Sequence, residues 1–286
     1  MTGLKIGGVP EHFNLPWRLA IEEGKFREIG LDLHWSDMSG GTGQMVRGLE
    51  SGSIDIAVLL TEGITKAILE GLDARILQVY VTTPLHWGVH VPYHSDINSI
   101  DQLEGKTFAI SRKGSGSELM AYVKADLEGW DTSQLKFNVV GDVYGGLWAL
   151  ENNEAQAFLW EKYTTFPFCE QKKCRYIDEV VTPWPCFVIA VKNSVYEKHA
   201  GLLDQMCKVV NNKAREIKSH SYSVDIISWR YNLRSGQVKN WLIETDWNYD
   251  GIEYPLAFEK TIRYLLKLQL ISPEQADNWR EKLFFR

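Results

Sequence analysis

Short apolar runs alternate with helical patterns through the first ninety residues, and this alternation constrains the fold more than any other feature of the chain. The pattern predicts strands at 4–9, 31–35, 54–60 and 74–82, with a helix after each of the first three. The run at 54–60 is almost entirely apolar, which is typical of a strand covered on both faces of its sheet. Strand–helix repetition of this kind predicts a parallel α/β sheet.

A second unit of the same kind begins near Pro92, after an extended segment at 85–91. Another extended segment, at 182–191, follows it, and the pattern is then mostly helical to Arg286. We therefore expect a first lobe of residues 1–90, a second lobe of residues 91–185 and a return to the first lobe at 186–286, joined by two hinge crossovers. The second lobe is predicted to hold strands at 107–111, 136–140 and 155–159 and helices at 99–105, 117–127 and 144–151.

The loop Ser39-Gly-Gly-Thr-Gly-Gln44 lies between a predicted strand and a predicted helix. Small residues at such a junction expose backbone N–H groups at the positive end of the helix dipole, where an anion or a polar head group can bind. Ligands of open α/β sheets bind outside the carboxyl ends of the strands. Polar or aromatic residues also occupy the junctions at 9–13, 60–62, 111–117 and 160–161. The five junctions together predict one small-molecule site.

Composition limits the classes of function. A length of 286 residues fits two lobes, and a net charge of −6 without a basic stripe argues against nucleic-acid binding. No apolar run reaches membrane-spanning length, so we expect no membrane insertion. The first residues lead at once into a strand and show no basic n-region, apolar h-region or cleavage site, so we expect a cytoplasmic protein as the sequence stands, and a periplasmic or lipid-anchored one if a leader was removed. Eleven Trp and twelve Tyr indicate either core filling or a planar ligand.

Four cysteines occur, at positions 169, 174, 186 and 207. Cys169 and Cys174 have no nearby His pair or second Cys pair, which argues against a zinc site. We expect free structural thiols, no metal and no cofactor.

The order of several short motifs resembles the type II periplasmic-binding-protein superfamily, the solute-binding proteins of ABC transporters for alkanesulfonates, taurine, nitrate and thiamine pyrimidine precursors. Each motif is weak alone, but their collinear order extends over nearly the whole chain. The motifs are Ala20-Ile-Glu-Glu-Gly-Lys-Phe26 with Gly30-Leu-Asp32, Gly40-Gly-Thr-Gly43, Leu49-x-Ser-Gly-x-Ile-Asp-Ile-Ala57, Ser99-Ile-Asp-Gln-Leu-Glu-Gly-Lys106 and the segment 141–150. Val9-Pro-Glu-His-Phe13 and Trp160-Glu161 look like the thiamine-precursor branch. The resemblance implies a two-lobed α/β fold that clamps a ligand and releases it by hinge opening. It also implies an ABC permease as partner if the protein is exported, and we expect a monomer.

The candidate ligand-binding residues lie at the five junctions, at a further one before residue 144, and at the hinge. They are Pro10, Glu11, His12, Ser39, Gly40, Thr42, Thr61, Glu62, Ser115, Gly116, Ser117, Tyr144, Trp160 and Glu161, with Trp87 and Trp184 at the hinge. Structural explanations also exist: a glutamate at a helix start is favoured by the macrodipole, and serines there cap the helix. His12 fits either a ligand contact or a supporting hydrogen bond, and Trp184 fits a hinge plug better than a stacking surface.

Three of these candidates are acidic, whereas Arg112 and Lys113 are the only candidate cations near the junctions. Such a site favours a neutral or cationic nitrogen heterocycle, pyrimidine-like, which can donate hydrogen bonds to carboxylates and stack on Trp. The first alternative is a cytosolic enzyme of thiamine or menaquinone metabolism on the same scaffold, with His12 or His86 as a base. The second alternative is an anion binder of the alkanesulfonate or taurine type. A ligand-sensing module read by a protein partner also stays open. The sequence has no nucleophile elbow, P-loop or cysteine-rich iron-binding run, so we assign no catalytic residue.

Overall fold

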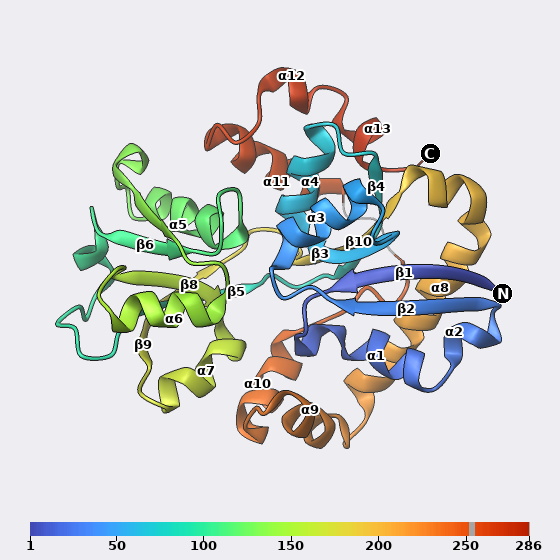
Figure 1. The fold of residues 1–286 in the computed structure, drawn as a ribbon, viewed down its shortest axis with the longest axis horizontal. Helices are drawn as coiled ribbons and strands as arrows, with labels where there is room; N and C mark the ends of the chain where they lie inside the picture. The colour runs from blue at the N-terminus through green and yellow to red at the C-terminus, as the bar shows by residue number, and fades with distance from the viewer. Residues whose placement is uncertain (252–254, 286) are drawn as a thin grey trace. The chain divides into compact units, whose positions relative to one another are not determined.

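The structure, a computed structural model, describes residues 1–251 and 255–285. The chain divides into two compact units (Figure 1). Unit 1 comprises Met1–Pro84 and Pro183–Arg286, and unit 2 comprises Leu85–Thr182. The chain passes between the units twice, before Leu85 and after Thr182, which agrees with the predicted two-lobed α/β architecture. Arg286, where the predicted helical region ends, lies outside the described residues.

Unit 1 contains a five-stranded sheet in the order β2-β1-β3-β10-β4. The strands are β1 (Thr2–Gly8), β2 (Leu31–Asp37), β3 (Ile56–Leu60), β4 (Ala74–Val81) and β10 (Phe187–Lys192). β1 pairs in parallel with β2 and β3, whereas β10 is antiparallel to both β3 and β4. β1, β2, β3 and β4 therefore all run in the same direction, as predicted from the first ninety residues, and β10 runs against them. This strand enters unit 1 directly after the second crossover, and no βα repeat precedes it to set a parallel direction.

Helices cover both faces of this sheet. They are α1 (Leu15–Glu22), α2 (Lys25–Glu28), α3 (Gly41–Ser51), α4 (Thr61–Leu69), α8 (Asn193–Ser219), α9 (Ser223–Tyr231), α10 (Ser235–Glu244), α11 (Pro255–Lys267), α12 (Pro273–Ala276) and α13 (Trp279–Leu283), with a 3-10 turn η1 (His12–Asn14). α1 packs on α2 and α8, while α4 packs on α3, α11 and α13, on the opposite side of the sheet (Figure 1). The helix predicted between Asn14 and Gly30 is broken at Gly24, which adopts the left-handed conformation (φ 74°).

Unit 2 repeats this sheet plan in the order β7-β6-β8-β5-β9. The strands are β5 (His86–Pro92), β6 (Thr107–Ile110), β7 (Lys136–Val139), β8 (Ala157–Glu161) and β9 (Cys174–Val181). β6 is parallel to β7 and β8, and β5 is antiparallel to β8 and β9. In each unit, the strand that follows a crossover is the antiparallel one. β5, expected in the first lobe, is hydrogen-bonded into the sheet of unit 2.

The helices of unit 2 are α5 (Gly116–Leu127), α6 (Val143–Glu151) and α7 (Lys162–Glu170), with 3-10 turns η2 (Ile100–Leu103) and η3 (Thr132–Gln134). α5 lies on one face of the sheet, and α6 and α7 lie on the other (Figure 1). The sequence pattern predicted neither α7 nor β9. α7 contains Pro167, an unusual residue inside a helix, and most of β9 is only half-buried, so neither element has a clear periodicity.

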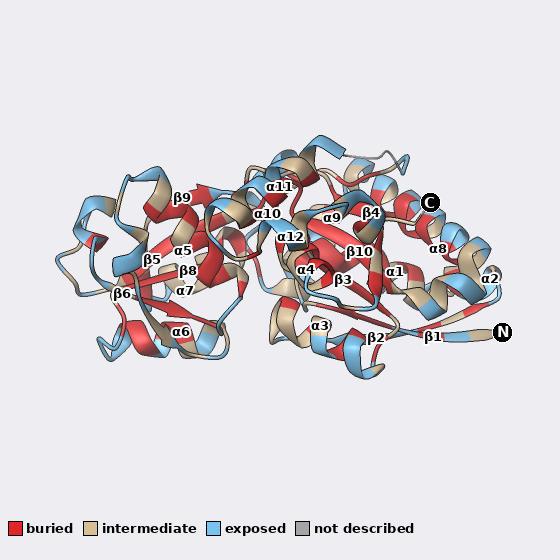
Figure 2. Cartoon of the chain, turned by 90° about the horizontal axis from the view of Figure 1, so that it is seen from above, coloured by how far each residue is buried: buried red, intermediate tan, exposed pale blue. Residues whose placement is uncertain are grey.

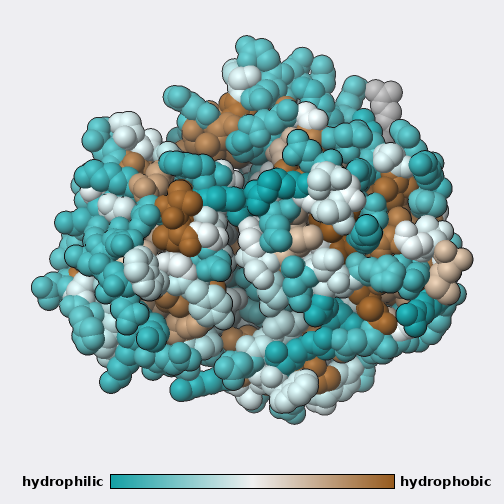
Figure 3. Space-filling view, in the orientation of Figure 1, coloured by the Kyte–Doolittle hydropathy of each residue, from teal (hydrophilic) through white to brown (hydrophobic). Residues whose placement is uncertain are grey.

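The central strands of each sheet form its core, shown in red in Figure 2. One cluster in unit 2 packs Leu147 and Leu150 of α6 onto Phe158 of β8. Gly146 allows this close approach, because a Cβ there would lie 2.5 Å from the Phe158 ring. The face in Figure 3 is mainly hydrophilic, with separate hydrophobic patches. No described helix is long and apolar enough to cross a membrane.

Candidate functional site

The topology of unit 1 brings three predicted junctions to one edge of its sheet. β1, β2 and β3 run in parallel, so their carboxyl ends lie at the same edge. β10 is antiparallel to β3, so the segment before β10, which carries Trp184, lies at this edge too. The candidates of unit 1 are Pro10, Glu11 and His12 after β1, Ser39, Gly40 and Thr42 around the start of α3, Thr61 and Glu62 after β3, and Trp184.

Glu62 has the most unusual environment of these residues. It lies in the first turn of α4, and only 1% of its surface is exposed. Trp184 Nε1 donates a 2.8 Å hydrogen bond to Glu62 Oε2, while Glu62 Oε1 is buried without a hydrogen-bond partner in the described part of the chain. Burial raises the pKa of Glu62 to about 7, although hydrogen bonds from its own backbone and from Trp184 oppose the shift. The carboxyl group is therefore poised to titrate near neutral pH.

The start of α4 is held against the segment that follows the second crossover. Thr61 Oγ1 donates a 2.6 Å hydrogen bond to the carbonyl of Pro185, and the Trp184 ring packs edge-on against Tyr264 with 5.5 Å between ring centroids. Trp184 is 2% exposed. These contacts keep the indole N–H beside Glu62.

His12 belongs to an aromatic cluster. Its ring lies 4.3 Å from the Trp241 ring and 4.9 Å from the Phe13 ring, measured between centroids. Burial lowers the pKa of His12 to about 3, so the imidazole is neutral at neutral pH. His12 Nε2 has no hydrogen-bond partner among residues 1–251 and 255–285. The neutral ring packs as an aromatic side chain and can offer one nitrogen as donor or acceptor.

A pocket of about 180 Å³ opens beside the end of β1. Pro10 and Glu11 line it together with two arginines, Arg18 and Arg230, which sequence reasoning missed. Arg18 lies on α1, and Arg230 comes from α9, far along the chain, so no local motif marks them. Both guanidinium groups are paired. The full lining is Val9, Pro10, Glu11, Asn14, Arg18, Trp35, Asp37, Arg230 and Tyr231.

These ion pairs balance the charge of the pocket. Arg18 Nη1 lies 3.4 Å from Asp37 Oδ1, and Arg230 Nη1 donates a 3.0 Å hydrogen bond to Glu22 Oε2. The expectation that Arg112 and Lys113 are the only cations near the candidate residues is therefore wrong. Sequence spacing alone did not indicate that distant arginines reach the end of β1.

The glycine-rich junction has the predicted strand–loop–helix form, with α3 beginning at Gly41. Its first backbone donor is already used, because Gln44 Oε1 accepts a 2.8 Å hydrogen bond from the Gly40 N–H. Thr42 is buried, and its Oγ1 accepts a 3.4 Å hydrogen bond from the backbone N–H of Leu60. Ser39 is exposed. Thr42 therefore holds α3 against β3, and Ser39 is the junction side chain open to solvent.

In unit 2 the candidate serines lie at the start of α5. Ser115 is the N-cap residue and accepts a 3.4 Å hydrogen bond from the Glu118 N–H. Ser117 Oγ accepts a 3.0 Å hydrogen bond from the Ser111 N–H and lies 3.0 Å from Ser115 Oγ. Ser115 and Ser117 are each 2% exposed, and Gly116 begins the helix. The hydroxyl groups organise the junction.

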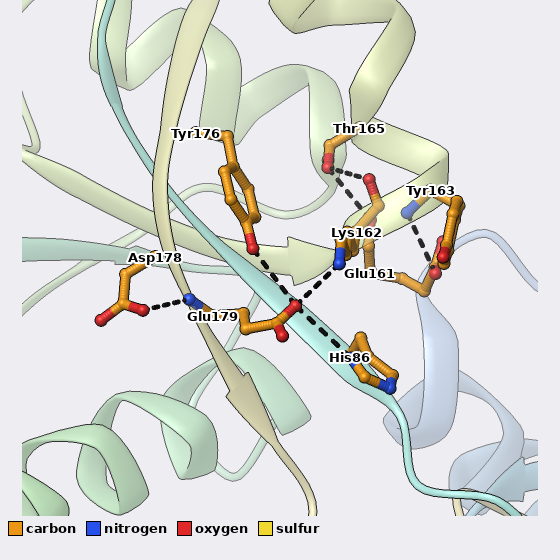
Figure 4. A network of polar contacts seen from close by, with 8 residues as sticks. All are labelled: His86, Glu161, Lys162, Tyr163, Thr165, Tyr176, Asp178 and Glu179. Carbon is orange, nitrogen blue, oxygen red and sulfur yellow. Dashed lines mark hydrogen bonds and ion pairs between the residues drawn. The ribbon is translucent and has the colours of Figure 1, made fainter. Parts of the chain in front are cut away.

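Glu161 is likewise a capping residue. One carboxylate oxygen accepts a 3.1 Å hydrogen bond from the backbone N–H of Tyr163 (Figure 4). The other accepts a 2.7 Å hydrogen bond from the backbone N–H of Thr164. Burial raises the pKa of Glu161, and the hydrogen bonds from Thr164 and Tyr163 oppose the shift. The carboxylate differs from that of Glu62 because both of its oxygens are hydrogen-bonded.

Beside Glu161 lies a polar network centred on Glu179 of β9 (Figure 4). Glu179 Oε2 lies 3.0 Å from Lys162 Nζ, 3.2 Å from the Tyr176 hydroxyl and 3.4 Å from His86 Nδ1. Partial burial would raise the pKa of Glu179, but Lys162 and His86 hold it below its usual range. The network joins β5, α7 and β9. The sequence did not reveal it, because β9 was not predicted.

The remaining aromatic candidates differ in exposure. Trp87 on β5 is 5% exposed and pairs in register with Glu161. Trp160 is half-buried, with its ring 5.4 Å from that of Phe158. Tyr144 on α6 is 68% exposed. Because β6, β7 and β8 are parallel, the predicted junctions of unit 2 also lie at one edge of its sheet.

The described residues include no group of three or more His, Cys, Asp and Glu side chains arranged to hold a metal ion.

Comparison with known proteins identifies the fold. Residues 87–180 match the family model described as Ca3427-like PBP. No curated protein sequence matches the chain.

Three solved structures illustrate the likeness. The Candida albicans CA3427 gene product, described as having the generic periplasmic binding protein fold, has a TM-score of 0.90 and 23% identity over 99% of this chain and 95% of that one. The alkanesulfonate-binding protein SsuA from Xanthomonas axonopodis pv. citri, bound to MOPS, has a TM-score of 0.81 and 14% identity over 96% of each chain. The periplasmic nitrate-binding protein NrtA from Synechocystis PCC 6803 has a TM-score of 0.77 and 14% identity over 99% of this chain and 88% of that one.

Proposed function

We propose that this protein, which has the fold of the type II periplasmic binding proteins, is a solute-binding protein for a small nitrogen-containing metabolite. An amino-substituted, pyrimidine-like heterocycle fits best. The observation that carries this proposal is Glu62, a buried carboxyl group with one oxygen bonded to Trp184 and the other left without a partner in the described structure.

A buried acceptor without a partner is costly, and a ligand that supplies the missing donor recovers that cost. An amino group or ring N–H can donate to Glu62 Oε1, whereas a sulfonate or nitrate offers only acceptors. Trp184 Nε1 can only donate, and its hydrogen bond uses Glu62 Oε2 as the acceptor. When Glu62 is ionised, its other oxygen is also an acceptor and needs a donor from the ligand. The pair therefore favours a neutral or cationic nitrogen compound over an anion.

One observation favours the anion binder as a second candidate. Arg18 and Arg230 line the pocket beside Pro10 and Glu11, and arginine is well suited to bind oxyanions. Both arginines already form ion pairs, with Asp37 and Glu22, so an anion would have to compete with resident carboxylates. Alkanesulfonates and nitrate, the ligands in the names of SsuA and NrtA, are therefore the comparison ligands for the test.

We also propose that an exported form acts with an ABC permease, to which it delivers its ligand. A cytoplasmic form would act instead as an intracellular binder of the same compound. Cell fractionation distinguishes the two forms. The exported form should co-purify with a permease from the membrane fraction, whereas the cytoplasmic form should remain in the soluble fraction.

The test is isothermal titration calorimetry of the whole chain with an aminopyrimidine, ethanesulfonate and nitrate, for wild type and Glu62→Gln. The aminopyrimidine should bind wild type and lose about tenfold in affinity with Glu62→Gln, because a charge-assisted hydrogen bond becomes a neutral one. Glu70→Gln, an exposed glutamate at the other end of the same helix, is the matched control and should bind normally. Binding of ethanesulfonate or nitrate without aminopyrimidine binding would refute the hydrogen-bond-donating nitrogen ligand and favour the anion binder.

A further inference from the structure

Two thiols in unit 2 lie in contact although neither takes part in the proposed ligand site. Cys169 is in the last turn of α7, and Cys174 is the first residue of β9. Their Sγ atoms are 3.4 Å apart. Cys169 is half-buried, whereas Cys174 is 1% exposed.

The connecting turn determines this proximity. The N–H of Lys172 donates to the carbonyl of Cys169 at 3.0 Å, and the N–H of Lys173 donates to the carbonyl of Phe168 at 2.9 Å. Lys172 adopts a left-handed conformation, with φ 61°, which reverses the chain. Residues 170–173 are all exposed, so no packing opposes a small adjustment of the turn. A disulfide has an S–S length of about 2.05 Å, so bond formation requires the sulfur atoms to approach by little more than an ångström.

The two sulfur atoms have different chemical environments. The Cys169 and Cys174 sulfur atoms share a hydrogen bond in which either can be the donor. This contact with Cys174 lowers the pKa of the Cys169 thiol, burial opposes the shift, and the nearby His90 ring assists it. The hydrogen bond and burial raise the pKa of Cys174. His90 is held in place by Thr165 Oγ1, 2.8 Å from His90 Nε2. The more accessible sulfur is therefore the better nucleophile, and the buried one is placed to resolve an adduct on it.

We propose that Cys169 and Cys174 form a redox-active dithiol that a small-molecule disulfide, such as oxidised glutathione, converts to an intramolecular disulfide. The Cys169 thiolate attacks one sulfur of oxidised glutathione, forming a mixed disulfide and releasing glutathione thiolate, which takes up the proton lost by Cys169. Cys174 then loses its proton and attacks Cys169 Sγ, and a second glutathione leaves with that proton. The two protein thiols are oxidised and one glutathione disulfide is reduced to two thiols.

The bond would tie the C-terminal end of α7 to β9. The N-terminal end of α7 is already tied to the same strand, because Lys162 Nζ lies 3.0 Å from Glu179 Oε2. Oxidation would thus fix α7 to β9 at both ends, and α7 directly follows Glu161. The dithiol would report redox conditions as a change in the rigidity of this part of unit 2. This inference does not depend on the identity of the ligand.

The experiment exposes the reduced whole chain to oxidised glutathione and follows it by intact mass and by peptide mapping. Wild type should lose two hydrogens, carry a bridge between Cys169 and Cys174, and recover both thiols with a reductant. Cys174→Ser should stop at one glutathione adduct on Cys169. Cys169→Ser should react with oxidised glutathione more slowly than wild type, because it lacks the more accessible thiol.

Cys186→Ser and Cys207→Ser are matched controls, since both residues are buried at other positions and should leave the bridge unchanged. A bridge that includes Cys186 or Cys207 would overturn the proposal. A wild-type chain that retains a glutathione adduct, or that does not react faster than Cys169→Ser, would overturn it too.

Discussion

Replacement of Glu62 by glutamine should change how stability depends on pH. In the native state the pKa of Glu62 is raised from 4.5 to about 7 by complete burial. At about 1.36 kcal/mol per pKa unit, this difference corresponds to about 3 kcal/mol. The native state holds the proton more tightly than the unfolded chain, so the contribution of Glu62 is fully present below the unfolded pKa. It is lost as the pH rises through about 7.

Glutamine stays neutral at every pH and can still accept the hydrogen bond from Trp184. The free energy of unfolding of Glu62→Gln relative to wild type should therefore rise by about 3 kcal/mol between pH 4.5 and pH 8. Denaturant unfolding, followed by tryptophan fluorescence and circular dichroism at several pH values, measures this difference. The difference in free energy of unfolding between the variant and wild type removes the contributions of all groups that titrate equally in both proteins.

Glu70→Gln is the control for the loss of one carboxylate from α4. The Glu70 side chain is 42% exposed and pairs with Lys66, so its stability difference from wild type should show no comparable rise with pH. A flat difference for Glu62→Gln across this range would refute the reasoning. It would mean that the carboxylate is solvated in solution and that the basis of the proposed ligand preference is wrong.

Three further predictions test other parts of the structure. The pKa of His12 is lowered from 6.5 to about 3, so its contribution to stability is present above pH 6.5 and is lost as the pH falls towards 3. The free energy of unfolding of His12→Phe relative to wild type, measured in denaturant, should therefore rise by up to about 5 kcal/mol as the pH falls through this range. Gly146→Ala should lower the free energy of unfolding by about 1–3 kcal/mol through overpacking. Gly201→Ala, which has open space around its added Cβ, is the control and should leave the free energy of unfolding unchanged or raise it. Equal effects of the two substitutions in denaturant unfolding would contradict the packing argument. The disulfide between Cys169 and Cys174 closes a short loop and should stabilise unit 2 by about 2 kcal/mol. The oxidised chain should therefore have a higher melting temperature than the reduced chain. An equal or lower melting temperature of the oxidised chain would argue that the bond strains the turn.

The local pattern was sufficient to locate most elements. The apolar run before Thr61 and the small-residue loop before Gln44 mark strand ends and helix starts through short-range chemistry, and β3, α3 and α4 lie where that chemistry predicts. α7 and β9 were missed because one contains a proline and the other is a half-buried edge strand, so the usual periodicity is weak.

The sequence by itself determined the order of strands and helices, and with it the junctions that carry the candidate residues, because propensity, capping and hydrophobic period act over a few neighbouring residues. Only the tertiary structure decided what each side chain meets. Glu62 is paired with Trp184, which is 122 positions away, and Arg230 joins Arg18 at the end of β1. Such pairings depend on how elements pack. Glu62 and Glu161 are both buried, yet Glu161 caps a helix with both oxygens hydrogen-bonded, whereas Glu62 has one oxygen without a partner among the residues that the structure describes.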